Sequence, residues 1–352
     1  MGARWNYRGK DFVNRQIQLA ARPKGYPKDT DFRLVEAEIP RPVEGQMLCR
    51  TIYLSLDPYM RGRMNARASY VAGLEIGDVM TGGTVASVIE SNLDEYEVGD
   101  FVVNGNGWQE YALSDGQGVR KLDPSVAPLS TAIGVLGMPG QTAYVGLLDI
   151  GKPQPGETVV VSAASGAVGA VVGQIARIKG CRVVGVAGAV EKCKYVVDEL
   201  GFDACVSHLS DHVSDELAAA CSEGVDVYFE NVGGKVFEGV LPLLNTFARV
   251  PVCGLIATYN LINPSLGPEH VARVMRLILF RRLTLRGFIV FDHTDREPDF
   301  LRDVGSWIRD GSLKYKEDIV VGLNHAVESF QGLLRGKNFG KLIVRVSDDP
   351  TR

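Results

Sequence analysis

The fold class of this chain is decided by residues 158–176, which read TVVVSAASGAVGAVVGQIA. A run of β-branched apolar residues stops at small residues and is followed by a helical pattern. This order predicts a strand, a tight turn and a helix whose first N–H groups can bind a phosphate. The segment carries no charge, so a membrane-spanning helix is the alternative interpretation. Gly166, Gly169 and Gly173 interrupt its apolar character and disfavour that alternative.

Length and composition restrict the possible classes of protein. A chain of 352 residues favours two domains. The net charge of −4 lacks the basic excess of nucleic-acid-binding domains, so we expect no nucleic-acid partner. The six cysteines form no Cys-x-x-Cys pair, and the N-terminal residues contain neither the apolar core of a signal peptide nor a myristoylation signal. We therefore expect reduced thiols, no membrane association and a cytoplasmic protein.

The spacing of apolar and polar residues changes near Pro128. Short apolar runs separated by turn residues fill 30–125 and predict a mostly antiparallel β domain. From about 158 to 292, apolar strands alternate with helix-length segments, which predicts βαβ units and a doubly wound parallel sheet. We therefore expect a β domain over 1–130, completed by 311–352, and a dinucleotide-binding domain over 131–310. The strands expected in the second domain are 158–162, 182–187, 225–230, 248–254 and 284–290, and its helices are 168–179, 191–200, 235–245 and 269–281. The tail adds helices near 299–310 and 324–335 and strands at 319–321 and 341–346.

The turn after the first of these strands points to a dinucleotide. It reads Ala164-x-Gly166-x-x-Gly169, with alanine where the usual fingerprint has its first glycine. Tight packing of a helix on a sheet is the alternative explanation, but the surrounding βαβ order is what the fingerprint requires. NAD enzymes place an acid at the end of the second strand, whereas this chain has small neutral residues there and Lys192 shortly after. This favours NADP(H), although Glu191 could be the missing acid and Lys192 a solvated surface residue.

The sequence contains no recognisable set of metal ligands. Its five histidines are scattered, and none pairs with a cysteine at ligand spacing, so we expect no metal. Without a metal, an enzyme that transfers hydride must stabilise the developing negative charge by hydrogen bonds. Reduction of a C=C bond conjugated to a carbonyl suits this, because a tyrosine hydroxyl can polarise the oxygen and supply a proton.

Several segments resemble the zinc-independent medium-chain dehydrogenases/reductases. One more segment, 53–64, resembles the branch that contains prostaglandin, alkenal double-bond and curcumin reductases. The resemblance runs from about residue 10 to residue 346. It implies a GroES-like first domain, a Rossmann second domain, NADP(H), a small enone or enal substrate and a homodimer that pairs edge strands. The other matching segments are 137–144 (GMPGQTAY), 164–169 (ASGAVG), 230–234 (ENVGG) and 253–260 (CGLIATYN).

The resemblance also implies roles for individual residues. Tyr259 matches the tyrosine near the enone oxygen and is the implied catalytic residue. His208 departs from the family, because several relatives carry a tyrosine beside the 2′-phosphate at this position. The implied contacts are Gly166, Ala167, Val168 and Gly169 for the pyrophosphate; Lys192 and His208 for the 2′-phosphate; Asn231, Cys253, Thr258, Tyr259, Phe288, Ile289, Val290 and Asn338 for the nicotinamide side; and Tyr53, Arg63 and Met64 for the substrate.

Simpler explanations exist for some of these positions, and other functions exist for the chain. Val168 and Ile289 could be core residues, Asn231 could cap a turn, and Tyr259 could be a packing residue. The function that the resemblance implies is NADPH-dependent reduction of the C=C bond of α,β-unsaturated ketones and aldehydes. The alternatives are an NADPH quinone oxidoreductase and a non-catalytic, crystallin-like NADPH-binding protein.

Overall fold

The computed structural model describes residues 13–66, 71–261 and 268–352. These residues form two compact units. Unit 1 contains the chain up to Ile133 together with Glu317–Asn338 and Leu342–Arg352, and unit 2 contains Gly134–Lys316 and Phe339–Lys341. The sequence pattern places the corresponding boundaries at residues 130 and 310. Within the described parts of the chain, no helix is both long enough and apolar enough to cross a bilayer.

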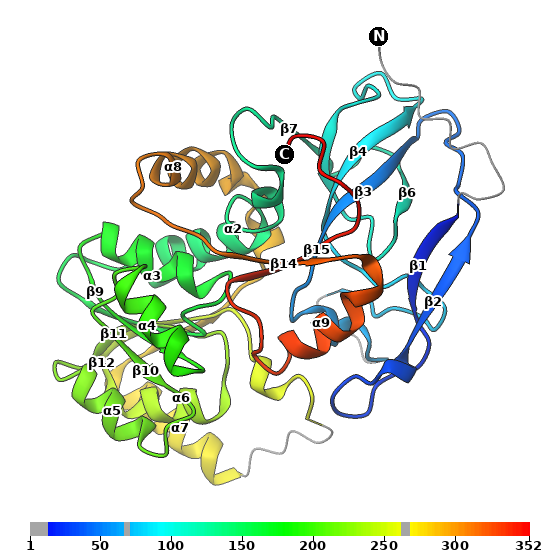
Figure 1. Ribbon diagram of the computed structural model, residues 1–352. Coiled ribbons are helices and arrows are strands. Elements are labelled where there is room, and N and C mark those ends of the chain that lie inside the picture. The colour runs from blue at the N-terminus through cyan, green and yellow to red at the C-terminus, as the bar shows by residue number, and fades with distance from the viewer. Residues whose placement is uncertain (1–12, 67–70, 262–267) are drawn as a thin grey trace. The chain divides into compact units, whose positions relative to one another are not determined.

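Unit 2 is built on a six-stranded parallel sheet with the strand order β10-β9-β8-β11-β12-β13. Figure 1 labels four of these strands, β9, β10, β11 and β12, among the helices of the unit. The strand order is the Rossmann order 3-2-1-4-5-6, whose switch point lies between the first and fourth strands, here β8 and β11. The predicted doubly wound domain is confirmed. The strands are β8 (Thr158–Ser162), β9 (Arg182–Ala187), β10 (Ala204–Ser207), β11 (Val225–Phe229), β12 (Leu244–Val252) and β13 (Thr284–Gly287).

Both faces of this sheet are buried. Successive side chains of a strand point to opposite faces. Val159 and Val161 accordingly join one apolar cluster, with residues from α2, α3 and α8, while Val160 joins another, with residues from α5, α6 and α7. Layers of helix on both faces explain why the strands are continuous apolar runs. The helices are α2 (Met138–Val145), α3 (Gly169–Ile178), α4 (Val190–Asp198), α5 (Val213–Ala220), α6 (Gly234–Val240), α7 (Pro268–Arg281) and α8 (Glu297–Arg309), with a π-helical turn η3 (Gly146–Gly151) and 3-10 turns η4 (Leu241–Leu243), η5 (Ile256–Thr258) and η6 (Val290–Arg296).

The elements differ from the sequence-based expectations in a few places. Strand β10 and helix α5 are additional, because the four residues of β10 form too short a pattern to be recognised. The helix expected over 235–245 ends at Val240, and β12 begins at Leu244, since Pro242 cannot continue an α-helix. The strand expected over 284–290 ends at Gly287, and η6 begins at Val290.

Unit 1 contains a seven-stranded sheet in the order β14-β15-β3-β4-β5-β7, with β6 paired to β3. The pairs β15–β3, β3–β4, β3–β6, β4–β5 and β5–β7 are antiparallel, which confirms the predicted mostly antiparallel domain. A separate hairpin-like pair joins β1 and β2. The elements are β1 (Asn14–Leu19), η1 (Asp29–Asp31), β2 (Phe32–Ala37), β3 (Met47–Ser55), α1 (Met60–Arg63), β4 (Thr84–Ser91), β5 (Phe101–Asn104), β6 (Tyr111–Ser114), β7 (Arg120–Leu122), η2 (Leu129–Ile133), β14 (Glu317–Val321), η7 (Leu323–His325), α9 (Ala326–Leu333) and β15 (Lys341–Arg345).

Aromatic rings fill the centre of unit 1. Trp108 is fully buried, stacks on Phe32 at 6.0 Å between ring centroids, and meets Phe330 of α9 edge-on at 5.5 Å. Phe330 of α9 thus packs against Phe32 and Trp108, although α9 lies more than two hundred residues after them in the sequence. The last strand, β15, pairs with β3 as expected for a tail that rejoins the first domain.

Candidate active site

The turn between β8 and α3 is shaped to bring a ligand close to its backbone. A Cβ on Gly169 would lie 2.3 Å from the carbonyl oxygen of Ala163, and one on Gly166 would lie 3.1 Å from the same atom. Only glycine therefore fits at position 169. Gly166, Ala167 and Val168 are half-buried and lie at the start of α3, where the first N–H groups have no partner within the helix. The residues present fit a pyrophosphate.

The tail of the chain also reaches this turn. Gly340 belongs to unit 2 and forms an isolated parallel bridge with Gly166. Asn338, the predicted residue from the tail, precedes Gly340 by two positions, is half-buried and belongs to unit 1.

Two basic side chains lie near one another at the ends of β9 and β10. Lys192 is half-buried in the first turn of α4, and His208 directly follows β10. A Cβ on Gly188 would lie 3.5 Å from His208 Nε2. His208 is an exposed residue, but its ring is partly desolvated, and this lowers the pKa of the ring. The positive charge of Lys192 lowers that pKa further. The two residues predicted for a 2′-phosphate are therefore neighbours, whereas the alternative acid, Glu191, is an exposed residue of α4.

Asn231 lies just beyond β11, at the switch point of the sheet. Its backbone N–H donates to Ser162 Oγ at 2.8 Å, and its side-chain Nδ2 donates to the Ser162 carbonyl at 2.8 Å. Next to it, the Glu230 carboxylate accepts hydrogen bonds from the N–H groups of Val232 and Gly233. The Asn231 side chain therefore joins the end of β11 to the end of β8, while the N–H groups of the following turn are accepted by Glu230.

A hollow of about 480 Å³ lies at the carboxyl ends of β12 and β13. Its walls come from two segments, the loop after β12 and the segment after β13. The Tyr259 hydroxyl faces back toward its own loop and accepts a hydrogen bond from the Leu255 N–H at 3.3 Å. The structure therefore brings together five predicted residues, whereas Val290 is buried and does not line the hollow. The lining residues are Val252, Cys253, Gly254, Leu255, Thr258, Tyr259, Gly287, Phe288, Ile289 and Asp292.

Close packing against Phe229 and η3 fixes the position of Phe288 in the wall of the hollow. The Phe288 ring meets Phe229 edge-on at 6.3 Å between centroids. A Cβ on Gly146, in η3, would lie 2.5 Å from the tip of the Phe288 ring, so only glycine leaves room for it. Burial raises the pKa of the Cys253 thiol to about 12, so this wall residue is a neutral thiol at physiological pH.

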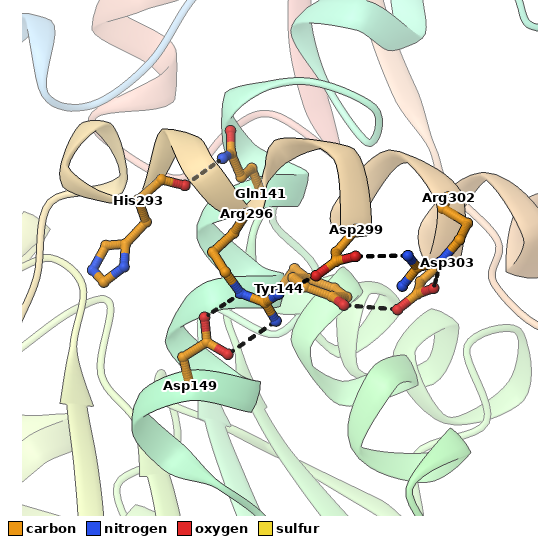
Figure 2. Close-up of polar contacts among 8 residues, drawn as sticks. All are labelled: Gln141, Tyr144, Asp149, His293, Arg296, Asp299, Arg302 and Asp303. Carbon is orange, nitrogen blue, oxygen red and sulfur yellow. Dashed lines mark hydrogen bonds and ion pairs between the residues drawn. The ribbon is translucent and has the colours of Figure 1, made fainter.

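An ion-pair network holds η6, the turn that follows this wall. Figure 2 shows the Arg296 guanidinium between two carboxylates. It donates to Asp149 of η3 through two nitrogens, at 2.9 and 3.2 Å, and also to Asp299 of α8. The same guanidinium lies 5.5 Å from the ring centroid of Tyr144. Because the Arg296 guanidinium donates to Asp149 through two nitrogens, this ion pair fixes the orientation of η6 relative to η3.

Two further hydrogen bonds connect this network with α2, the helix formed by most of the GMPGQTAY segment (Figure 2). Gln141 Nε2 donates to the His293 carbonyl at 3.1 Å, and the Tyr144 hydroxyl donates to Asp303 Oδ2 at 2.7 Å. Burial and the Asp303 carboxylate raise the pKa of Tyr144 to about 12. The GMPGQTAY segment therefore supports the wall of the hollow, while its tyrosine is fully engaged in packing.

The predicted substrate residues belong to unit 1. Tyr53 is buried in β3, and its hydroxyl donates to Asp349 at 3.0 Å, while Met64 is buried in the apolar core. Arg63, at the end of α1, is half-buried, and its Nε has no hydrogen bond to any described residue. Of the three, Arg63 is thus the residue whose side chain is partly accessible. Their substrate contacts stay predictions.

No metal centre can be assembled from the described residues. Within 13–66, 71–261 and 268–352, no group of three or more His, Cys, Asp or Glu side chains could hold a metal ion. The sequence analysis did not identify Gly287 and Asp292, which line the hollow, or the contact between Ser162 and Glu230. The acidic residue at the end of the apolar strand 225–230 was the available signal for that pair.

Comparisons with known proteins agree with this geometry. Residues 15–122 match the family model described as the N-terminal domain of oxidoreductase, and residues 167–305 match that of zinc-binding dehydrogenase. The chain is 52% identical to an NADPH-dependent curcumin reductase of Escherichia coli over 96% of its own length and 98% of that protein. It is 40% identical to a 2-alkenal reductase (NADP(+)-dependent) of Nicotiana tabacum, over 96% of this chain and 99% of that one. The crystal structure of CurA from Vibrio vulnificus in complex with NADPH superposes with a TM-score of 0.93 at 50% identity, covering 95% of this chain and 100% of the other.

These likenesses extend over nearly the whole chain and include both units. They confirm the resemblance drawn from the sequence motifs. The chain belongs to the medium-chain dehydrogenase/reductase family, in the zinc-independent branch of the curcumin, prostaglandin and 2-alkenal reductases.

Proposed function

We propose that this protein is an NADPH-dependent reductase of the C=C bond of α,β-unsaturated ketones and aldehydes. The observation that carries the proposal is the hollow at the ends of β12 and β13, which presents the Tyr259 side chain beside the apolar wall of Phe288 and Ile289. A conjugated carbonyl compound requires an apolar surface and one hydrogen-bond donor at its oxygen, and this hollow contains both.

The same unit provides the groups that the cofactor requires. The backbone of Gly166–Gly169 at the start of α3 suits the pyrophosphate, and Lys192 with His208 suits the 2′-phosphate. We propose that Asn231 and the loop after β12 contact the nicotinamide side, with Val290 and Asn338 as outer neighbours. When bound, a reduced nicotinamide supplies the hydride that adds to the β-carbon.

Tyr259 is the proposed catalytic residue. Its oxygen accepts the Leu255 N–H, and a phenol that accepts a hydrogen bond becomes a better donor through its own O–H. Donation to the substrate carbonyl stabilises the enolate oxygen as negative charge develops. The α-carbon then takes a proton, from Tyr259 or from a water that it orients. The apolar wall excludes bulk water from the developing charge.

The experiment that tests this proposal compares substrates and one variant. The oxidation of NADPH is followed at the nicotinamide absorbance with an enone, an enal and a quinone. We expect enone turnover, and Tyr259→Phe should lower kcat about 10- to 100-fold, the range for one lost transition-state hydrogen bond or proton donor. NADPH binding should change little. Turnover of the quinone alone would favour the alternative enzyme, and NADPH binding without any turnover would favour a non-catalytic protein.

We also propose a homodimer, supported by α7 and by the outer side of β13, which pairs with no strand among the described residues. Strand β13 ends the sheet order, and its backbone can pair with a second copy. On α7, Val271, Met275 and Leu279 recur every four residues and are each at least half exposed, which forms an apolar stripe. Light scattering should give twice the monomer mass of 38.2 kDa. A monomeric mass at micromolar concentration would contradict the dimer.

A cytoplasmic location is the final part of the proposal. All six cysteines are free thiols, and several are buried, as is common in proteins of reducing compartments. Fractionation of cells that express the native chain tests the location, and its recovery with membranes would contradict it.

A further inference from the structure

A buried carboxyl group lies behind the proposed site and takes no part in the chemistry described above. Glu230 directly follows β11 and is 1% exposed. Its Oε1 accepts three hydrogen bonds, from Ser162 Oγ at 3.1 Å and from the N–H groups of Val232 at 2.6 Å and Gly233 at 2.9 Å. Its Oε2 is buried and makes no hydrogen bond of ordinary geometry to any residue that the structure describes, although the carboxyl group interacts with the phenol of Tyr228.

The main chain of Glu230 holds a second loop. Its carbonyl oxygen accepts the N–H groups of Cys253 at 2.9 Å and Gly254 at 3.1 Å. The next residue in that loop, Leu255, donates to the hydroxyl of Tyr259 at 3.3 Å. One residue therefore connects the turn after β11, through its side chain, with the loop that presents Tyr259, through its backbone.

Hydrogen bonds between the two loops complete the connection. The N–H groups of Ile256 and Ala257 donate to the carbonyls of Asn231 and Val232, at 3.4 and 3.0 Å. A shift of the turn after β11 is thereby transmitted to the loop that lines the hollow.

Burying a carboxyl group in this place is costly. Burial raises the pKa of Glu230, and the N–H groups of Val232 and Gly233 oppose that rise. The phenol of Tyr228, which faces the same interior, also has its pKa raised well above the usual range, with burial as the main cause. A buried polar group that is only partly hydrogen-bonded stabilises a fold poorly, so its presence calls for a role other than packing.

We propose that Glu230 is a positioning residue, which holds the Asn231–Gly234 turn and the Cys253–Tyr259 loop in the arrangement that the nicotinamide and the substrate oxygen require. This inference rests on the proposed function for its catalytic consequence, but the order of the two loops can be measured without catalysis. Glu230 acts through the backbone groups that it accepts from and through Ser162.

The test uses Glu230→Ala, Glu230→Gln and a matched control, Asp226→Asn. Asp226 is also in β11, but at its opposite end, where it accepts hydrogen bonds from the Thr158 N–H and from Asn245. Amide hydrogen exchange is measured on the enzyme without cofactor, for peptides that cover 231–234 and 253–259. NADPH binding is measured by fluorescence titration, and kcat and KM are measured with an enone.

Glu230→Ala removes the acceptor of two N–H groups. We expect exchange in both loops to become at least about tenfold faster, and NADPH affinity and kcat each to fall about 10- to 100-fold. Glu230→Gln keeps an acceptor oxygen in place and should stay within about threefold of the parent enzyme. Asp226→Asn should lower the unfolding midpoint without changing exchange in the two loops.

Three results would overturn the proposal. Unchanged exchange in both loops of Glu230→Ala would show that the carboxyl group does not hold them. An effect of Asp226→Asn equal to that of Glu230→Ala would reduce it to general stability. A Glu230→Gln variant as impaired as Glu230→Ala would show that negative charge matters rather than the accepted hydrogen bonds.

Two further readouts keep the test decisive. If Glu230→Ala does not fold, Ser162→Ala removes one hydrogen bond to the carboxyl and the acceptor of the Asn231 N–H. It should speed exchange in 231–234, and unchanged exchange there would contradict the proposal. If exchange responds as expected while the parent enzyme reduces no enone, the proposed function fails and the positioning role stands.

Discussion

Removal of the Lys192 ammonium group should affect the binding of NADPH and NADH to different extents. Lys192→Ala is expected to weaken NADPH binding and to leave NADH binding nearly unchanged, because NADH lacks the 2′-phosphate. Two unit charges at 4 Å attract by about 4 kcal/mol at an effective dielectric constant of 20. Lys192 is only half-buried, so solvent reduces this value to that of an ordinary charged hydrogen bond, about 1.5–3 kcal/mol. That range corresponds to a loss of about 10- to 150-fold in affinity for NADPH.

The assay is a titration of enzyme with NADPH and NADH, followed by the fluorescence of the bound nicotinamide. The matched control is Lys194→Ala, which removes an exposed lysine from the same helix two residues later. It should leave both affinities within about twofold, since surface charges this exposed contribute little. Equal losses for NADPH and NADH in Lys192→Ala, or no loss for either, would refute the assignment of Lys192 to the 2′-phosphate.

Other perturbations test the electrostatics and the packing of unit 2. The pKa of His208 lies below its usual value, so binding of the 2′-phosphate should bring proton uptake, and NADPH affinity should rise as pH falls, by at most about tenfold per pH unit. His208→Gln should remove that component of the pH dependence, and an unchanged slope would contradict it. In Gly173→Ala, the new Cβ would lie 1.8 Å from the buried ring of Phe202, and the overpacking should cost about 1–3 kcal/mol of unfolding free energy in urea. Arg296→Met removes the partly exposed pair with Asp149 and should cost about 1 kcal/mol at low salt; a cost that does not shrink in 1 M NaCl would argue against the ion pair as its source.

Much of unit 2 could be predicted because its signals are local. The run at 182–187 matches β9 at both ends, since a β-branched strand covered on both faces is apolar throughout. The glycine turn before α3 was recognised from spacing within six residues. Strand β10 was missed because Ala204–Ser207 is a four-residue strand at the edge of the sheet, with β9 as its single neighbouring strand among the described residues.

The Ser162–Glu230 pair could not be predicted from spacing. Its two residues are 68 positions apart, and they meet because β8 and β11 are adjacent in the sheet. Adjacency of the first and fourth strands is a property of the whole topology and leaves no periodic mark in either segment. Of the two residues predicted for the 2′-phosphate, Lys192 was found from the sequence itself, because it lies shortly after the second strand, whereas His208, at the end of β10, was found through the resemblance.

The topology also explains why a costly carboxyl group is located where it is. At a switch point, the helices that follow the two central strands leave to opposite faces, so the strand ends are not covered by the helices themselves. Polar contacts join the end of β8 and the loops after β11 and β12 to one another. The Glu230 carboxyl group accepts hydrogen bonds from Ser162 at the end of β8 and from the turn after β11, which an apolar side chain could not do, while its main-chain carbonyl holds the loop after β12. We therefore expect the positions of the residues that line the hollow to depend on these hydrogen bonds. A substitution of Glu230 should lower catalytic activity more than it lowers the stability of the fold.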